Sequence, residues 1–418
     1  MLYIPFLFFL ALTIYYWKKK QCIDVSVFLF AEYALTSFFS ILCVNLSLLG
    51  EGGIHFTQMN LQLNAIPTLL YCTLIALVIL PFTRLDIRKF SSIENQKAHL
   101  FDGVTYFLFA VALLNIYIVA DNVIDTLQEG DFASTRSMHY AGETDTSKTE
   151  NLPKILGYFH YFNRSTLLAL PWFFYSICFL KKHWTYNVAL FVASLSLPLY
   201  GIQNADRTEF IFYAQTFILS YILFKPYIYT PQKKFLKKLI LPFTVFFIIY
   251  LSAVTIARFA ERDAGASGGA IRYAGQSYLN FCYYYENAND EHIYTHRMFP
   301  LTNHILTNES YLNDIKNTQG DEQGFFVGVF PSFLGDFLLD TGVTGMIVWV
   351  MMFVTITFIS FPTNKAPTIS FGSILWYYVL ATIPMFGIFY YPYFEFMQGI
   401  FLVLTVIIAI SLHYKFKF

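Results

Sequence analysis

Eleven apolar stretches dominate this chain, and each is near the length that an α-helix needs to cross a lipid bilayer. Hydrophobic residues make up 56% of the sequence and charged residues only 13%. A domain of this composition would not stay soluble in water. The sequence therefore predicts an all-α, polytopic membrane protein, a single integral membrane domain over residues 1–418. The predicted spans are residues 2–17, 25–49, 65–82, 104–120, 158–180, 186–200, 210–224, 239–257, 333–361, 369–389 and 394–412.

The basic residues of the short loops predict the orientation, because Lys and Arg are retained on the cytoplasmic side during insertion. Short loops on the opposite side contain one basic residue, Arg207. An N-terminus outside and a C-terminus inside follow, with both long loops, 121–157 and 258–332, on the outer face. The basic residues assigned to the inner face are Lys18, Lys19, Lys20, Arg84, Arg88, Lys89, Lys97, Lys181, Lys182, Lys225, Lys233, Lys234, Lys237, Lys238, Lys365, Lys415 and Lys417.

The first apolar stretch has an alternative interpretation as a signal peptide. It has no basic segment before it, and Lys18 to Lys20 follow it as a stop-transfer flank would. We therefore interpret it as a span. Four of the five cysteines lie in or beside spans, and Cys282 stands alone in the second long loop, so no disulfide framework is indicated.

Motifs of soluble enzymes are nearly missing from the sequence. Residues 142–149 imitate a phosphate-binding loop, but Ser147 stands where the second glycine is needed, and a solvated acidic loop is the better interpretation. His292 and His296 have a spacing that suits a metal, yet a third ligand at motif spacing is missing. We expect no metal, no cofactor and, without a basic stripe, no nucleic acid.

Arginines near the predicted outer membrane boundary are the polar residues that most strongly indicate a functional site. Arg207 lies between two spans, Arg258 and Arg262 open the second long loop four residues apart, and Arg164 lies within the predicted fifth span. An ionised group within a membrane costs several kcal/mol unless it lines a polar cavity or has a partner. Planar guanidinium groups bind phosphoryl oxygens through two parallel hydrogen bonds, so the set predicts a phosphate or pyrophosphate site.

A plainer interpretation applies to each arginine taken singly. It could extend to the lipid headgroups, or pair with a nearby acid such as Asp206, Glu209 or Glu261. For four arginines on one face, a shared anion explains the set better.

Aromatic and amide residues follow these arginines in the second long loop. Arg272, Tyr273, Gln276 and Tyr278 are of types that suit sugar rings, whose faces stack on aromatics and whose hydroxyls need planar donors and acceptors. Tyrosine is also common at membrane interfaces. These four residues are therefore candidates for substrate binding because of their proximity in sequence to the arginines.

The whole layout resembles the bacterial O-antigen polymerases, the oligosaccharide repeat-unit polymerases known as Wzy. The resemblance rests on the long outer loop between late spans, on the Arg-Thr-Glu-Phe sequence at 207–210 and on the sequence at 333–345, which contains Asp336. It implies a helical membrane glycosyltransferase fold of the GT-C-like kind. It also implies polymerisation of undecaprenyl-pyrophosphate-linked oligosaccharides at the outer face of the inner membrane, with membrane lipid and a chain-length regulator as partners.

Such a reaction transfers a growing glycan from its pyrophosphate carrier to a hydroxyl of another lipid-linked repeat. Arg207 and Arg258, with the other arginines, would stabilise the departing pyrophosphate. Glu209, His304 and Asp336 are candidates for the base that accepts the hydroxyl proton. The alternatives are an O-antigen ligase, which differs in its acceptor, and a flippase or other polysaccharide transporter.

Overall fold

The computed structural model describes most of the chain. It covers residues 1–50, 54–57, 59–95, 97–141, 159–180, 182–259, 265–289, 292, 297–299, 301, 323, 325, 327, 329–361 and 367–413, without the side chains of 139–141 and 258–259. Its contacts divide the chain into two compact units. Unit 1 consists of Met1–Asp86, Ser267–Asn364 and Val379–Gly399, and unit 2 of Ile87–Ala266, Lys365–Tyr378 and Ile400–Phe418.

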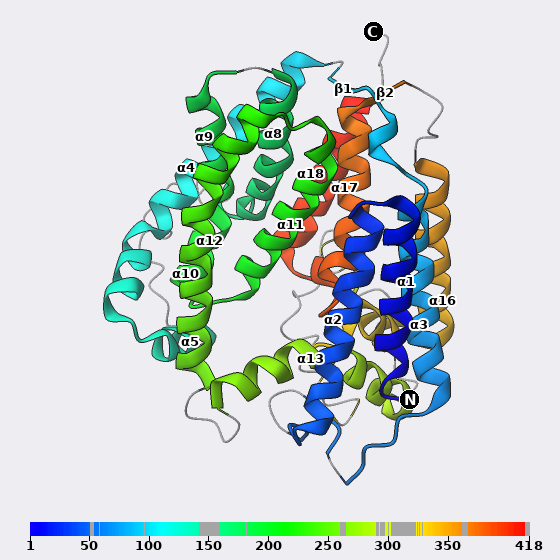
Figure 1. Cartoon of the computed structure of the whole chain (residues 1–418). Helices are drawn as coiled ribbons and strands as arrows, with labels where there is room; N and C mark the ends of the chain where they lie inside the picture. Colours follow the sequence, from blue (N-terminus) through cyan, green and yellow to red (C-terminus); the bar gives the residue numbers. More distant parts are fainter. Residues whose placement is uncertain are drawn as a thin grey trace. The chain divides into compact units, whose positions relative to one another are not determined.

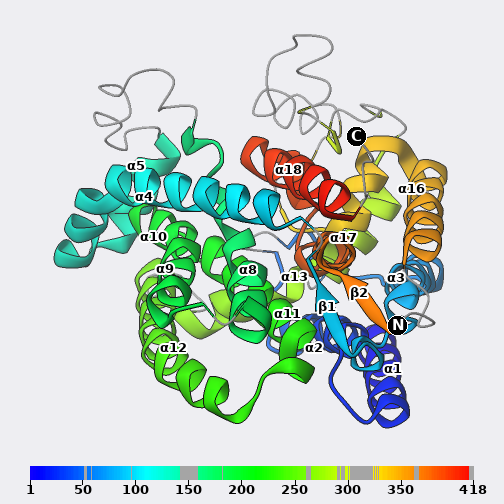
Figure 2. The same ribbon diagram turned by 90° about the horizontal axis from the view of Figure 1, so that it is seen from above.

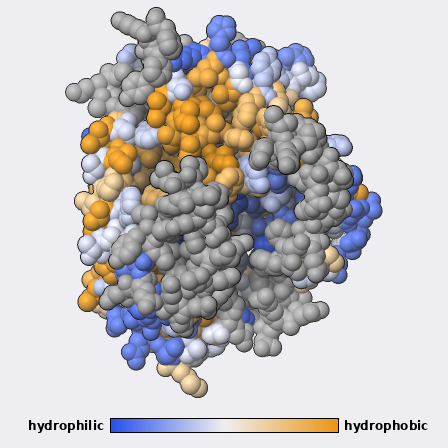
Figure 3. Space-filling view, turned by 180° about the vertical axis from the view of Figure 1, so that it is seen from behind, coloured by the Kyte–Doolittle hydropathy of each residue, from blue (hydrophilic) through white to orange (hydrophobic). Residues whose placement is uncertain are grey.

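Seven helices in the described part of the chain are long and apolar enough to cross a membrane, so the protein is a multi-pass, helical membrane protein. Figure 3 shows hydrophobic side chains gathered into a continuous area below a hydrophilic upper margin, as a lipid-facing surface requires. The seven segments are Val25–Asn45, Ala65–Lys89, Ala98–Glu129, Trp184–Gln203, Thr230–Ala257, Ser332–Ser360 and Phe396–His413.

The other four predicted spans are also helical but shorter or interrupted. Helices α1 (Ile4–Lys20), α11 (Thr208–Phe224) and α17 (Phe371–Phe386) have 17, 17 and 16 residues. The predicted span at 158–180 contains the 3₁₀ helix η3 (Asn163–Leu168), helix α8 (Ala169–Tyr175) and the π-helical turn η4 (Ser176–Leu180). Pro171 contributes to this break, because proline has no N–H to donate to the carbonyl four residues earlier.

Unit 1 is built on α1, α2 (Val25–Asn45), α3 (Ala65–Ile79), α13 (Gly265–Asn287) and α16 (Ser332–Ser360). Helices α1 and α2 lie side by side, as do α3 and α16 (Figures 1 and 2). The side chain of Asp24 starts α2 by accepting a hydrogen bond from the Val27 N–H at 3.0 Å. The short helices η1 (Leu80–Thr83) and η6 (Pro392–Phe394) and residues 379–386 of α17 also belong to this unit.

Helix α13 approaches α2 very closely at Gly275. A Cβ atom at this position would lie 2.5 Å from the backbone carbonyl carbon and oxygen of Phe39. The Ser40 hydroxyl donates to the Gly275 carbonyl oxygen at 2.6 Å, and the Cys43 thiol donates to that of Ile271 at 3.4 Å. The absence of a side chain at Gly275 is therefore what permits the contact.

Helix α16 is interrupted at Gly342, where φ is 70° and ψ is −179°. Only glycine adopts this combination readily. The interruption separates a buried, acid-containing segment with Asp336 and Asp340 from a second segment whose exposed residues include Val348, Met351 and Ile359. The first segment thus belongs to the polar interior of unit 1 and the second has the composition of a lipid-facing helix.

Unit 2 contains most of the remaining helices. They are η2 (Ile87–Lys89), α4 (Ala98–Glu129), α5 (Phe132–Ala141), η3, α8, η4, α9 (Trp184–Ser194), α10 (Ser196–Gln203), α11, η5 (Lys225–Tyr227) and α12 (Thr230–Phe259), with α18 (Phe396–His413) ending in it. Two three-residue strands, β1 (Ser92–Glu94) and β2 (Thr368–Ser370), pair in parallel with Ile93 opposite Ile369. This is a small addition to the all-α prediction.

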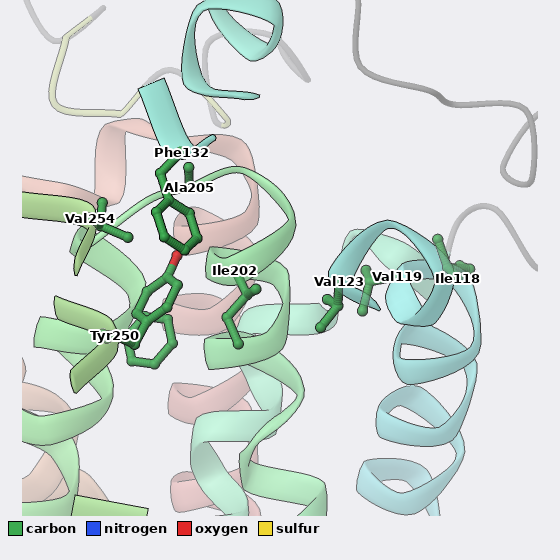
Figure 4. Packing of buried hydrophobic residues seen from close by; sticks show 9 residues of the cluster. Ile118, Val119, Val123, Phe132, Ile202, Ala205, Tyr250 and Val254 are labelled. Carbon is green, nitrogen blue, oxygen red and sulfur yellow. The ribbon is translucent and has the colours of Figure 1, made fainter. Parts of the chain in front are cut away.

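An apolar cluster joins α4, α5, α10, α11 and α12 within unit 2 (Figure 4). The Tyr250 ring packs edge-on against Phe132, with 5.8 Å between centroids, and stacks on Phe210 at 4.5 Å. The Tyr250 hydroxyl donates to the Gly201 carbonyl oxygen at 3.2 Å. This packing fixes the end of α10 and the beginning of α11, and the polar residues described next lie at that junction.

Candidate functional site

The candidate site is built on the turn between α10 and α11, residues 204–207. Ala205 has a positive φ of 46°, and the Asp206 N–H donates to the Gly201 carbonyl oxygen at 2.8 Å, which reverses the chain. The Asp206 side chain then accepts from the Thr208 N–H at 3.0 Å and caps the first turn of α11. The turn therefore places Arg207 and Glu209 at the N-terminal end of a 17-residue helix.

Arg164 reaches this helix end from η3. Its Nη2 donates to Glu209 Oε1 at 2.5 Å, and both side chains are nearly fully buried. The guanidinium also lies over the Phe212 ring, 5.6 Å from the centroid, one turn further along α11. The deepest predicted arginine is thus held between an acid and an aromatic face.

Arg207 points in another direction from the same helix end. Its Nη1 donates to the Thr255 hydroxyl on α12 at 3.3 Å, and the residue is only 6% exposed. A burial of this kind excludes the interpretation in which Arg207 extends to lipid headgroups at the surface of its unit. The guanidinium instead lies inside unit 2, between α11 and α12.

Arg136 on α5 supplies a third guanidinium. Its Nη1 donates to the Asn204 carbonyl oxygen at 3.3 Å, and its Nη2 lies 3.5 Å from Asp206 Oδ2. We call Arg136, Arg164 and Arg207, with Asp206 and Glu209, the arginine cluster. Every guanidinium of the cluster contacts, or belongs to, the six residues from Asn204 to Glu209.

The arginine cluster has a positive formal charge among the described residues, three guanidiniums against two carboxylates. The N-terminus of α11 adds a partial positive charge, because the peptide dipoles of a helix are aligned. Asn163, fully buried beside Arg164, accepts from the Ser196 hydroxyl at 2.7 Å through Oδ1. Its Nδ2 has no hydrogen-bond partner among the residues that the structure describes.

These features suit an anionic ligand with several acceptor oxygens. Guanidinium forks and a helix N-terminus both bind phosphoryl oxygens. Within the described ranges, no group of three or more His, Cys, Asp or Glu side chains could hold a metal ion.

Three of the predicted site residues fall wholly or partly outside the described part of the chain. Arg258 is in the last turn of α12, one turn beyond Thr255, but its side chain is not described. Arg262 and His304 lie outside the described residues altogether.

The other predicted site residues belong to unit 1, separately from the arginine cluster of unit 2. Asp336 is fully buried, and its Oδ1 accepts from Arg297 Nε at 2.8 Å and from Nη2 at 2.6 Å. Its Oδ2 accepts from the Tyr391 N–H at 2.6 Å. Asp340 accepts from the backbone N–H groups of Arg297 and Met298. The two acids thus hold residues 297 and 298 of the second long loop against α16.

The four residues predicted to bind sugar all lie on α13. Gln276 accepts from the Phe330 N–H at 3.4 Å, and the Tyr278 hydroxyl is 2.8 Å from that of Thr68. The Tyr273 ring packs edge-on against Phe330. Arg272 is 4% exposed. Gln276 and Tyr278 therefore have contacts that hold unit 1 together.

Sequence reasoning missed Arg136, Thr255 and Arg297. Arg136 stood in a predicted loop, and nothing in its surroundings indicated a helix that returns to the α10–α11 turn. Thr255 gave no signal at all. Arg297 was detectable as an arginine in the second long loop, but its partner is 39 residues away. Comparison of the chain with protein-family models, with curated proteins and with solved structures gave no match.

Proposed function

We propose that this protein is a membrane glycosyltransferase that polymerises oligosaccharide repeat units carried on a polyprenyl pyrophosphate. It transfers the growing glycan to a new lipid-linked repeat at the outer face of a bacterial inner membrane. Undecaprenyl pyrophosphate is the proposed carrier, and a chain-length regulator is a further partner. The proposal includes eleven spans, a fold like that of GT-C-like transferases, an N-terminus outside and a C-terminus in the cytoplasm.

The observation that carries the proposal is the arginine cluster at the N-terminus of α11. Arg164 and Arg207 are 5% and 6% exposed in a helical unit of membrane composition. Buried charge of this kind is costly and marks functional sites in membrane proteins. A lipid pyrophosphate is an anion that reaches its enzyme through the membrane, so it matches both the charge of the cluster and its surroundings.

The cluster acts on the leaving group in the proposed reaction. The acceptor hydroxyl oxygen forms a bond to the anomeric carbon, and the bond from that carbon to the pyrophosphate oxygen breaks with its electron pair. Negative charge grows on the pyrophosphate as this bond breaks. Arg207 and Arg136 stabilise that charge, with the N-terminal N–H groups of α11, while Glu209 keeps Arg164 in place.

The test is complementation of a strain that lacks the gene, with Arg207→Lys as the first variant. Lysine keeps the charge but loses the planar fork, so we expect polymer length to fall toward single repeats at normal protein amount. Loss of one donor to a transition-state anion lowers the rate by roughly a hundredfold to a thousandfold. Arg258→Lys is the second variant, and exposed Arg84→Lys is the matched control.

The surface polysaccharide of the deletion strain separates the alternatives. Single repeats on the lipid core mean that a polymerase is lost, whereas bare core means that a ligase or flippase is lost. Polymer of normal amount and length from Arg207→Lys would show that the cluster has a purely structural role.

A further inference from the structure

His160 has a ring nitrogen arrangement that a general base requires. Its Nδ1 lies 2.6 Å from Asn115 Oδ1 on α4. Asn115 is fully buried, and its Nδ2 donates to the Val111 carbonyl oxygen at 2.8 Å. That second bond fixes the amide orientation, because the opposite orientation would place two oxygens against each other. Asn115 therefore presents an acceptor to His160.

An acceptor at Nδ1 determines the tautomer of the neutral imidazole. Nδ1 carries the proton, and Nε2 is left with a lone pair. No described residue forms a hydrogen bond to Nε2, and His160 is only half-buried. The Tyr200 ring packs edge-on against the imidazole, with 5.5 Å between centroids, and holds its plane. The ring is thus oriented, and its basic nitrogen is accessible.

His160 also lies beside the arginine cluster within unit 2. Arg164 follows it by four residues through successive tight turns, closed by the bonds from Phe162 N–H to Phe159 O and from Ser165 N–H to Phe162 O. Four residues of such a helical path rise roughly 6 to 8 Å. The Tyr200 ring on α10 packs against His160, and the Tyr200 backbone carbonyl oxygen accepts from the Asn204 N–H at the start of the α10–α11 turn.

Glu209, Asp206 and Asp336 already accept hydrogen bonds from other groups. Glu209 accepts from Arg164, and protonating it would remove the charge that holds this arginine. Asp206 accepts from the Thr208 N–H and lies 3.5 Å from Arg136. Asp336 belongs to unit 1 and accepts from Arg297 and from the Tyr391 N–H. His160 is neutral, and its Nε2 lone pair receives no hydrogen bond from a described residue, so it can accept a proton without breaking an ion pair of the cluster.

We propose that His160 is the general base of the transfer reaction and that Asn115 is its positioning residue. The inference rests on the proposed function. As the acceptor oxygen bonds to the anomeric carbon, its proton moves to His160 Nε2, and the electron pair of the broken bond leaves with the lipid pyrophosphate. The imidazolium formed is stabilised by the Asn115 oxygen at Nδ1, and it later releases its proton to water.

His160→Asn is the decisive variant. Its Nδ2 takes the place of Nδ1 and keeps a donor for Asn115, but the side chain has no basic nitrogen. His160→Gln is a second non-basic variant that places an amide near the position of Nε2. His183→Asn is the matched control, because exposed His183 caps α9 and asparagine also caps helices.

The full-length protein is measured in proteoliposomes by two readouts. Turnover uses lipid-linked repeat units extracted from the strain that lacks this gene, and binding uses undecaprenyl pyrophosphate alone. We expect both His160 variants to bind within threefold of wild type and to turn over 10²- to 10⁴-fold more slowly. We expect the control to match wild type in both.

The possible failures are distinguishable. A wild-type protein that neither binds undecaprenyl pyrophosphate nor extends repeats would refute the proposed function. If the wild-type protein polymerises and His160→Asn turns over within threefold of it, only the base assignment is refuted. Loss of binding or of folding in both His160 variants would likewise refute it, since the residue would then act in binding or packing.

Discussion

Arg164 on η3 and Glu209 on α11 form a buried ion pair with 2.5 Å between Nη2 and Oε1, although 45 residues separate them in the chain. The pair joins a broken helical segment to the first turn of α11. Arg207, two residues before Glu209 at the same helix end, makes its own contact with Thr255 on α12. The arginine cluster therefore depends on this pair for its geometry as well as for its charge balance.

The Arg164–Glu209 pair should be sensitive to loss of one charge. We expect Glu209→Gln to lower the free energy of unfolding by about 3 kcal/mol, because Arg164 would stay buried without its counter-charge. Thermal unfolding of the purified protein in detergent measures this. Glu129→Gln, at an exposed site at the end of α4, is the control and should unfold like wild type. Equal stability of the two variants would contradict the prediction.

Asp336 and Arg297 should behave as a coupled pair in unit 1. We expect a double-mutant cycle with Asp336→Asn and Arg297→Gln to give a coupling energy of roughly 1 to 3 kcal/mol, because they share two hydrogen bonds in a buried place. Denaturation of the two single variants and the double variant gives this number. Additive effects, with a coupling energy near zero, would mean that each residue acts through other contacts.

Replacement by alanine should lower the stability of the protein at Gly275 but not at Gly103. Gly275→Ala should destabilise the protein by about 1 to 3 kcal/mol, because its Cβ would lie 2.5 Å from the Phe39 backbone. A Cβ at Gly103 on α4 would meet nothing within 4 Å, so Gly103→Ala should be neutral or stabilise by up to ~1 kcal/mol. The unfolding temperatures of both variants test this, and a tolerated Gly275→Ala would contradict the close α2–α13 contact.

Gly342 and Gly130 both have a positive φ but should differ in tolerance of asparagine. Gly130 has φ 68° and ψ 2°, a left-handed conformation that asparagine adopts at helix ends. Gly342 combines φ 70° with ψ −179°, a pair of values restricted to glycine, so Gly342→Asn should cost about 1 to 3 kcal/mol. A cost of a few tenths for Gly130→Asn, and a larger one for Gly342→Asn, is the expected result of unfolding experiments. Equal costs would show that α16 is not interrupted there.

The orientation in the membrane is testable by reporter fusions. Fusions after Gly268 and after Lys234 should report opposite compartments, with Lys234 in the cytoplasm, because basic residues of short loops are retained inside. An alkaline phosphatase and a green fluorescent protein fusion at each position provide mutual controls. The same compartment for both positions would overturn the predicted topology.

The sequence by itself determined the class of the protein and the location of its apolar segments. Each predicted span overlaps helical segments of the structure, and seven of these helices are long and apolar enough to cross a membrane, because hydrophobicity is a property of consecutive residues. It also pointed to Arg164, Arg207 and Glu209, since charged residues within or beside apolar segments stand out without knowledge of their partners. The break at 158–180 was harder to predict, because one proline within an apolar run still permits a span.

Only the tertiary structure decided which of these residues act together. The partners of Arg164, Arg136 and Asp336 are 45, 68 and 39 or more residues away in the chain. Such pairings depend on how the helices pack, so they cannot be predicted from the local sequence. Asp336 and Glu209 looked alike as candidate bases, yet each is occupied by an arginine, whereas the tautomer of His160 depends on a buried amide 45 residues earlier. Hydrophobicity therefore determines where the apolar helices lie in the chain, and long-range packing determines which polar side chains of different helices come into contact.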